Sequence, residues 1–326
     1  MHGLTALAGL RRDAFSDGEA IIRRHWELKW SITQSLRLDA NVAEQYRPPS
    51  LFELNLPAVS VPVQIYDAKR DEAVYAWLTF GGNSKLRPTT GGSTNIQLTY
   101  ASPDSLFASV NYFSIRLRDR VAVLPLEAVL AAEDQFDGRV GREQTPEDVA
   151  AGRAGRLTWV DTTRYNVGRL FTRGVDLTLR KTFDATFGTL TPQLDVTWID
   201  VFRYSDSPSK NAPLINRVGI ASEQGTITPW RAVASLGWQR NVWAATTYLR
   251  WVPAYQDVGG GRIGSQQLFD LNVSYAPSGR FALTLGATDI ANTSPRFARV
   301  GAAMGYDSSQ WDPVGRKVML TAKVSL

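Results

Sequence analysis

The sequence predicts an all-β protein, folded as a transmembrane antiparallel up-and-down β-barrel of about twelve strands. Three observations predict this class. Apolar and polar residues alternate with a period of two in segments along the whole chain, as in strands that present two different faces. Long and short connections alternate strictly between these segments, and large aromatic residues gather near the segment ends.

The alternation defines each predicted strand. In Phe281–Thr288, Phe, Leu and Ala occupy every second position, with Ala, Thr and Gly between them. Leu106–Leu117 alternates too, but its apolar phase shifts at Tyr112–Phe113, which predicts a β-bulge. The twelve predicted strands are Leu4–Leu10, Trp26–Ile32, Leu36–Val42, Ile96–Tyr100, Leu106–Leu117, Val175–Leu179, Leu190–Tyr204, Trp230–Trp238, Trp243–Trp251, Phe269–Tyr275, Phe281–Thr288 and Val318–Leu326.

The connections favour a barrel in a membrane over a soluble sandwich. Bacterial outer-membrane barrels have short turns on one side and long loops on the other, whereas Greek-key crossovers would break that order. The alternative is a soluble barrel whose aromatic residues form a core. The predicted long connections are 15–25, 46–92, 119–164, 205–227, 256–265 and 291–313, and the short ones are 33–34, 102–104, 184–187, 240–241 and 277–279.

Residues at particular positions agree with a lipid-facing and a lumen-facing side. Aromatic side chains near strand ends match the girdles of membrane barrels: Trp26, Trp30, Trp198, Tyr204, Trp230, Trp238, Trp243, Trp251 and Tyr275. The polar positions of the alternating strands include carboxylates near the middle of the strand that have no evident partner in the sequence. A water-filled lumen would accept such residues: Asp39, Asp176, Asp195 and Asp270.

The composition argues against several functional classes. The chain has no Cys and two His, so thiol chemistry, Cys-ligated metals and multi-histidine sites lack material. The net charge of +5 in 326 residues is not clustered, so nucleic-acid binding is not favoured. No apolar run approaches the length of a membrane-spanning helix. We expect no enzymatic activity, no cofactor and no resident metal.

Six short motifs, in order along the chain, resemble signatures of TonB-dependent outer-membrane receptors. They are Arg11–Asp17, the segment Arg-Pro-Pro-Ser-Leu-Phe-Glu-Leu at 47–54, Gly81–Pro88, Thr172–Leu177, Asp289–Pro295, and Gly315-Arg316 before the last strand. Thr89 stands where the third signature usually has Glu. The residues that carry the resemblance are Arg47, Pro49, Ser50, Leu51, Glu53, Leu54, Gly174, Asp176, Asn292, Gly315 and Arg316. A plain turn is the favoured role for Arg47–Leu54.

The resemblance also implies parts that this sequence does not match. Such receptors have a signal peptide, a TonB box and a plug domain before a barrel of 22 strands. The sequence enters a strand directly after Met1-His2, so we expect residues 1–326 to be a partial barrel domain without a plug, equivalent to strands 11–22. Twelve strands would have to close alone, pair with a missing half, or fail to insert.

The function implied by the resemblance is uptake of a scarce solute across the outer membrane of a Gram-negative bacterium. TonB, ExbB and ExbD would supply energy through the plug, outer-membrane lipid would surround the barrel, and the ligand would be a small molecule or metal chelate, by family frequency a ferric siderophore. The alternatives are a passive porin-like channel and an outer-membrane phospholipase or protease. Aromatic and basic residues of the long connections are the ligand-facing candidates: Tyr66, Tyr75, Trp77, Arg139, Arg142, Arg203, Tyr204 and Tyr255.

The connection 119–164 is either a lid over the ligand funnel or a solvated loop. Thr145-Pro146 has the pattern of a helix start, and Pro125–Phe136 predicts a second short helix.

Overall fold

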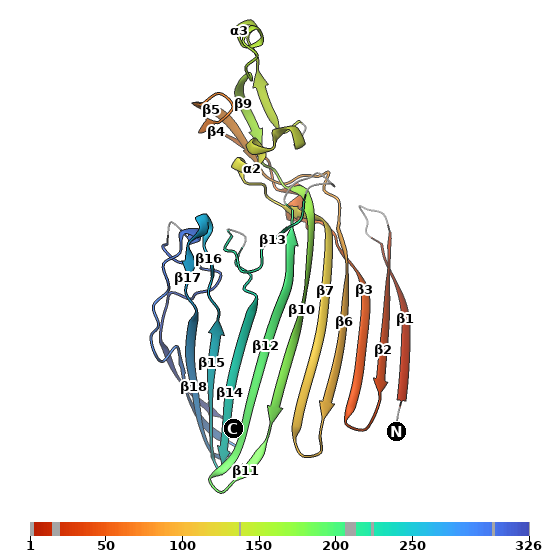
Figure 1. The fold of residues 1–326 in the computed structure, drawn as a ribbon, viewed down its shortest axis with the longest axis vertical. Coiled ribbons are helices and arrows are strands. Elements are labelled where there is room, and N and C mark those ends of the chain that lie inside the picture. The colour runs from red at the N-terminus through yellow and green to blue at the C-terminus, as the bar shows by residue number, and fades with distance from the viewer. Residues whose placement is uncertain are drawn as a thin grey trace.

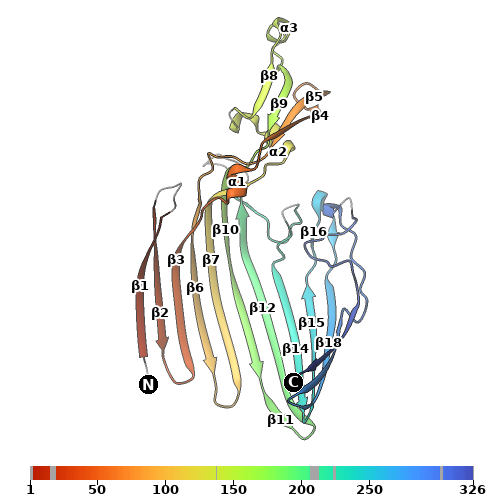
Figure 2. The same ribbon diagram turned by 180° about the vertical axis from the view of Figure 1, so that it is seen from behind.

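The computed structural model describes residues 3–14, 20–136, 138–205, 213–222, 225–301 and 304–325. Residues 15–17 of the Arg11–Asp17 motif, His2 and Leu326 lie outside these ranges. A curved antiparallel sheet dominates the structure, and a smaller sheet projects from one end of it (Figures 1 and 2). No helix in the described ranges is long and apolar enough to cross a membrane.

The main sheet is an up-and-down meander, which confirms all twelve predicted strands. Consecutive strands pair in the order β1 (Gly3–Asp13), β2 (Ile21–Ser31), β3 (Leu36–Arg47), β6 (Thr89–Ala101), β7 (Leu106–Ala122), β10 (Tyr165–Lys181), β12 (Gly188–Tyr204), β14 (Trp230–Arg240), β15 (Trp243–Val252), β18 (Gln266–Ser278), β19 (Phe281–Thr288) and β20 (Lys317–Val324). The short strands β11 (Phe183–Ala185) and β13 (Ile215–Asn216) add to β12. Among the described residues β1 and β20 do not pair with each other, so the sheet is open.

The register separates two faces and puts aromatic pairs at both ends of the outward face. Trp198 pairs with Trp230, and their rings stack 5.8 Å apart. Trp243 pairs with Tyr275 at the opposite end, with ring centroids 4.5 Å apart. The next such aromatic, Trp238, follows Trp230 by eight positions, or about 26 Å along the strand. This matches an apolar band about 25 Å tall.

The predicted bulge is wrong in position. The register of β7 with β6 and with β10 runs unbroken past Tyr112 and Phe113. The irregularity instead lies between Arg173 and Gly174, where β12 has one extra residue, Asp200. A Cβ on Gly174 would lie 2.7 Å from the Phe113 ring. Phe113 therefore faces inward over a residue without a side chain, and the apolar phase shift occurs without a bulge in β7.

The inward face carries the four predicted carboxylates, but the expectation that they lack partners is wrong. Each one accepts a hydrogen bond from a side chain on its own or a neighbouring strand. The pairs are Arg37 Nε to Asp39 at 3.0 Å, Thr197 Oγ1 to Asp176 at 2.8 Å, Thr178 Oγ1 to Asp195 at 2.8 Å and Arg250 Nε to Asp270 at 2.9 Å.

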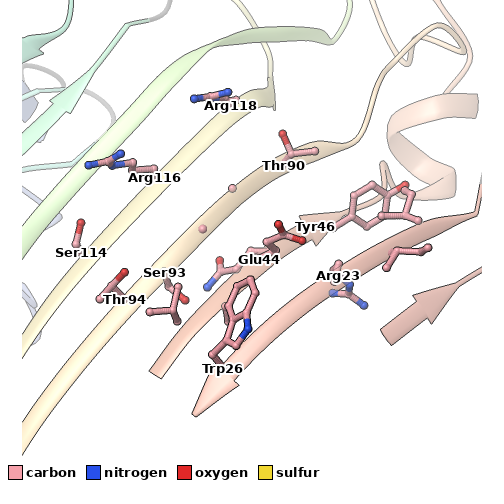
Figure 3. Close-up of a pocket in the computed structure, with 17 residues that line it drawn as sticks. Arg23, Trp26, Glu44, Tyr46, Thr90, Ser93, Thr94, Ser114, Arg116 and Arg118 are labelled. Atoms are coloured by element: carbon pink, nitrogen blue, oxygen red, sulfur yellow. The ribbon is translucent and has the colours of Figure 1, made fainter. Parts of the chain in front are cut away.

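Near the long connections the sheet is less regular. β2 pairs with β3 only as far as His25–Ala43. The first residues of β2, at its upper end near the long connections, are not paired with β3. A hollow remains between that end and β3, β6 and β7 (Figure 3).

Two of the long connections fold together into the projecting sheet. β4 (Val59–Asp67), β5 (Glu72–Phe80), β9 (Arg156–Asp161) and β8 (Val140–Glu143) pair in that order. The helices α2 (Leu126–Ala131) and α3 (Pro146–Ala150) lie within the same connections, as does the 3-10 turn η1 (Glu133–Gln135). Thr145 caps α3 as predicted, through a capping box with Asp148.

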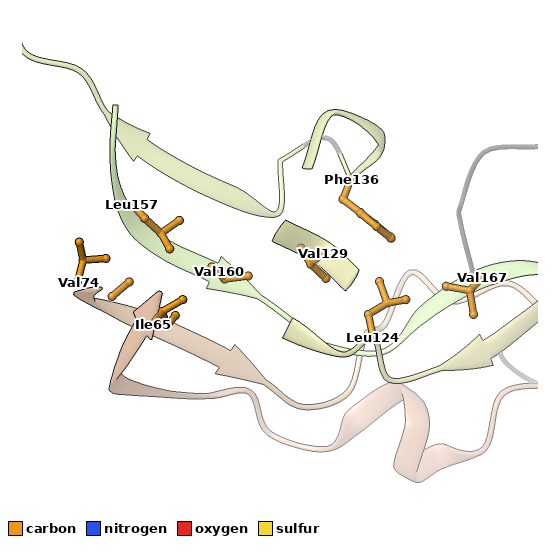
Figure 4. Packing of buried hydrophobic residues seen from close by; sticks show 9 residues of the cluster. Ile65, Val74, Leu124, Val129, Phe136, Leu157, Val160 and Val167 are labelled. Carbon is orange, nitrogen blue, oxygen red and sulfur yellow. The ribbon is translucent and has the colours of Figure 1, made fainter. Parts of the chain in front are cut away.

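The projection has its own hydrophobic core (Figure 4). Ile65, Val74 and Ala76 from β4 and β5 meet apolar side chains of the second connection. The buried members of this cluster are Ile65, Val74, Ala76, Leu124, Val129, Phe136, Leu157, Val160 and Val167. The described residues of the segment 123–164 are therefore a packed unit, and not only a solvated loop with incidental helices.

The remaining long connections carry shorter elements. Residues 253–265 contain β16 (Tyr255–Gln256), η2 (Val258–Gly260) and β17 (Arg262–Ile263), and η3 (Arg299–Gly301) follows β19. A second buried cluster joins these connections through Ala221, Tyr255, Ile263 and Ala298.

Candidate functional site

The motif at residues 47–54 forms a clasp at the loop end of β3. Pro48 and Pro49 end the strand, and Ser50 caps the single-turn helix α1 (Leu51–Asn55) through a capping box with Glu53. Arg47 binds the Glu53 carboxylate with both terminal nitrogens, each at 3.0 Å. These hydrogen bonds and charges from Arg47 lower the pKa of Glu53 to about 2. The segment is a helical turn and not the plain turn expected.

The Gly81–Pro88 motif docks onto this clasp. The Gly82 N–H donates to Leu56 O and the Asn83 N–H to Glu53 O, both at 2.9 Å. A Cβ at Gly82 would lie 2.7 Å from the Leu56 nitrogen, so only glycine permits this approach. Asn83 also donates to Arg164 O at 3.0 Å. Two motifs that are separate in sequence therefore form one contact at the sheet rim.

The other motif residues also hold backbone in place. Asn292 Oδ1 accepts from the Arg316 N–H at 3.1 Å, and a Cβ on Gly315 would lie 2.7 Å from the same oxygen. Gly174 lies at the bulge, where a Cβ would be 2.3 Å from Trp198 O. Asp176 belongs to the inward carboxylates. The structure gives the described motif residues roles in holding the fold, and brings none of them together as a ligand site.

The predicted aromatic candidates do come together. Register puts Tyr66, Tyr75 and Trp77 on the face of the projecting sheet opposite its core, with exposures of 61%, 70% and 54%. The parallel pairing of β5 with β9 adds Trp159, 39% exposed, beside Trp77. We call these four residues the aromatic face. Sequence reasoning missed Trp159, because the buried residues of β9, Leu157 and Val160, are three positions apart and give no period-two signal.

A basic cleft of about 980 Å³ lies at the base of the projection. Its charged lining residues are five cations against two carboxylates: Lys85, Arg87, Arg118, Arg139 and Arg169, with Asp119 and Asp161. Arg139 is held in place, because it donates to Thr163 O at 2.9 Å and lies over the Tyr165 ring at 4.4 Å. The cleft therefore favours an anionic solute.

The other four candidates lie elsewhere. Arg142 is enclosed in the projection, where it binds Asp67 at 2.7 Å and Glu133 at 2.9 Å. Tyr204 and Tyr255 are 7% and 3% exposed. Tyr255 donates to Asp307 at 3.0 Å, and burial, with that carboxylate nearby, raises the pKa of its hydroxyl. Arg203 is exposed on the outward face, paired with Phe171. No cluster of three or more potential metal ligands occurs in the described part of the chain.

Comparison with known proteins decides the family. The family model of the TonB-dependent receptor-like β-barrel matches residues 2–290. The chain belongs to this family. The members are receptors and transporters of the Gram-negative outer membrane, and the sequence resemblance is thereby confirmed. No protein of curated function matches the sequence.

Solved TonB-dependent receptors share the fold. A mutant ferric enterobactin receptor from Pseudomonas aeruginosa aligns with a TM-score of 0.69 and 17% identity, over 100% of this chain and 43% of its own. The siderophore receptor PirA from Acinetobacter baumannii gives 0.66 and 15%, over 99% and 43%. The copper transporter OprC gives 0.55 and 14%, over 94% and 40%. The chain thus spans less than half the length of these structures.

Proposed function

We propose that this chain forms part of the wall and of the extracellular capture surface of an outer-membrane receptor for TonB-energised uptake of a scarce anionic metal chelate. The family membership supports receptor function, and the basic cleft beneath the aromatic face carries the proposal for the ligand class. TonB, ExbB and ExbD would act through a plug domain of the same receptor, outside the sheet described above.

The surface chemistry suits a ferric siderophore of the catecholate type. Such a chelate combines net negative charge with planar aromatic rings. The cleft has an excess of three positive charges among its lining residues, and Lys85 and Arg87 are exposed there. The aromatic face offers rings for stacking, and each aromatic contact contributes about 0.5–1.5 kcal/mol. Capture would begin on the aromatic face and continue in the cleft.

We also propose that the twelve strands are one portion of a larger barrel. The two outer strands of the open sheet leave backbone groups unpaired, which costs several kcal/mol for each group in hydrocarbon. A passive channel of twelve strands would need β1 and β20 to pair, and the described residues give no such pairing. The passive channel is therefore the less favoured function.

Binding and uptake by cells that produce the protein from its native gene test the proposal. We expect outer membranes from these cells to bind ferric enterobactin, and iron uptake to stop when an uncoupler removes the proton gradient. Trp77→Ala and Lys85→Glu should each weaken binding about tenfold, because one removes a stacking ring and the other reverses a cleft charge. Phe297→Ala and Lys323→Glu change an exposed aromatic residue and a cation away from the site, and should leave binding unchanged.

Two results would contradict the proposal. Absence of binding to any ferric chelate, with the protein present in the outer membrane, would remove the ligand class. Solute flux that continues after uncoupling would favour the passive channel instead.

A further inference from the structure

The outward face changes chemistry sharply toward the long connections. The Trp198–Trp230 pair marks the end of the outward face that lies toward the long connections. The outward residues paired with Trp198 across the neighbouring strands, from β12 back to β3, are all apolar: Trp198, Val175, Tyr112, Ile96 and Ala40. Four positions further along these strands toward the long connections (five along β12, which has the extra residue Asp200), the outward residues that pair with one another are Glu44, Gly92, Arg116, Phe171 and Arg203. The following row contains Tyr46, Thr90, Arg118 and Arg169. A cationic belt therefore lies directly above the lipid-facing band.

The hollow beside the upper end of β2 lies within this belt (Figure 3). It has a volume of about 650 Å³, enough for part of a lipid-sized molecule. Ile22, Trp26 and Val42 give it an apolar side. Arg116 and Arg118 give it a cationic side; both are exposed, and Arg118 also lines the basic cleft. Glu44, the carboxylate that lines the groove, is paired with Arg24 at 3.6 Å. We call this hollow the outer groove.

The floor of the outer groove is open because of Gly92. This residue belongs to the outward row between Glu44 and Arg116, so a side chain there would project into the groove. A Cβ at Gly92 would meet only Ala43 O, at an ordinary 3.6 Å. Glycine is therefore not required by the backbone at this position, and its effect is to leave space beside the two arginines.

Arg116 is held in a defined place. Its guanidinium lies 5.2 Å from the centre of the Phe171 ring, on the paired position of β10. Such a contact orients the planar donor group, and an oriented guanidinium suits bidentate binding of phosphate oxygens. The apolar side of the groove continues into the lipid-facing band through Trp26 and Val42.

We propose that the outer groove binds a phosphorylated glycolipid of the outer leaflet, with a headgroup phosphate at Arg116 and Arg118 and an acyl chain along Ile22, Trp26 and Val42. The proposal rests on the outer-membrane location included in the proposed function. Charge complementarity and the direct continuity of the groove with the lipid-facing band identify this occupant.

Native mass spectrometry of the protein, extracted from outer membranes in mild detergent, tests the proposal. The probes are bisphosphorylated lipid A, its dephosphorylated form and phosphatidylethanolamine, with inorganic phosphate as a competitor. We expect retention of bisphosphorylated lipid A alone, without displacement by inorganic phosphate. Arg116→Gln and Gly92→Leu should each lower that retention about tenfold or more, by loss of a charged donor and by filling of the groove.

The matched control is Arg180→Gln. Arg180 lies 5.2 Å from the Phe107 ring, as Arg116 does from Phe171, but register places it on the inward face. Heat-modifiable migration in gels checks that each variant is folded. Equal retention of dephosphorylated lipid A, displacement by inorganic phosphate, or wild-type retention by folded Gly92→Leu would each overturn the proposal. Binding of ferric enterobactin is measured on the same samples, and a wild-type protein that binds the chelate but does not retain bisphosphorylated lipid A would overturn this inference alone.

Discussion

The clasp between Arg47 and Glu53 gives a quantitative prediction. Glu53→Gln keeps the size of the side chain and an acceptor for the Ser50 N–H, which donates to the carboxylate at 2.7 Å, but removes the charge that Arg47 binds. The clasp holds α1 against Gly82 and Asn83. The substitution should therefore loosen this contact and leave the main sheet intact.

The magnitude follows from the pKa and from exposure. Hydrogen bonds from Arg47 lower the Glu53 pKa from 4.5 to about 2, which sets an upper limit of about 3 kcal/mol for the charged interactions. Glu53 is 12% exposed but Arg47 is 52% exposed, so solvent screens much of this energy. We expect a loss of about 1–2 kcal/mol, close to that of a bidentate charged pair at a surface.

Hydrogen exchange of the Gly82 and Asn83 amides measures this loss, because both N–H groups donate to the clasp. At pH 7 the two amides of Glu53→Gln should exchange about 5–30 times faster than in the wild type. The Glu53 pKa is depressed by folding, so its contribution is complete above pH 4.5 and disappears as the pH falls toward 2. After correction for intrinsic exchange, the wild type should approach the variant over that range.

The control is Glu44→Gln, which removes an exposed pair with Arg24 at 3.6 Å and should leave both amides unchanged. Unaltered exchange in Glu53→Gln, or a variant that keeps the wild-type pH dependence, would refute the reasoning.

Two further predictions concern packing. Gly174→Ala should lower the free energy of unfolding by about 1–3 kcal/mol, because its Cβ would lie 2.3 Å from Trp198 O. Its control is Gly237→Ala, which should be nearly neutral because the nearest atom to its Cβ would be 3.6 Å away. Urea unfolding compares the two variants, and equal midpoints would contradict this prediction. Arg142→Met should destabilise the projection by about 3–5 kcal/mol, because it leaves the buried Asp67 carboxylate without its cation, and proteolysis within 123–164 should accelerate. Arg153→Met, at an exposed cation, is its control, and equal cleavage rates would refute the assignment.

The strands could be predicted because their signal is local. Period-two alternation and the order of connections determined the main sheet, since each face of a strand meets one environment along its whole length. The projection was missed for a related reason. Val59, Val61, Val63 and Ile65 alternate with Ser60, Pro62, Gln64 and Tyr66, but they lie inside a long connection that predicts a single loop.

Contacts between distant segments could not be predicted from periodicity. The docking of Gly82 and Asn83 onto α1 depends on how two connections meet, and neither segment specifies its partner. The same limit applies to exposure in loops. Tyr255 is an aromatic loop residue like Tyr75, yet a neighbouring connection supplies Asp307 and buries it.

The distribution of charge bears on how a solute would move. The rim has the basic cleft, whereas the inward face of the sheet carries carboxylates that are already hydrogen-bonded, two of them by Arg37 and Arg250. An anionic chelate would therefore be attracted to the rim, where the cleft has an excess of three cations. Attraction at the entrance favours capture, but it also opposes departure toward the lumen. We infer that inward movement requires work on the bound state, which favours energised transport over passive diffusion.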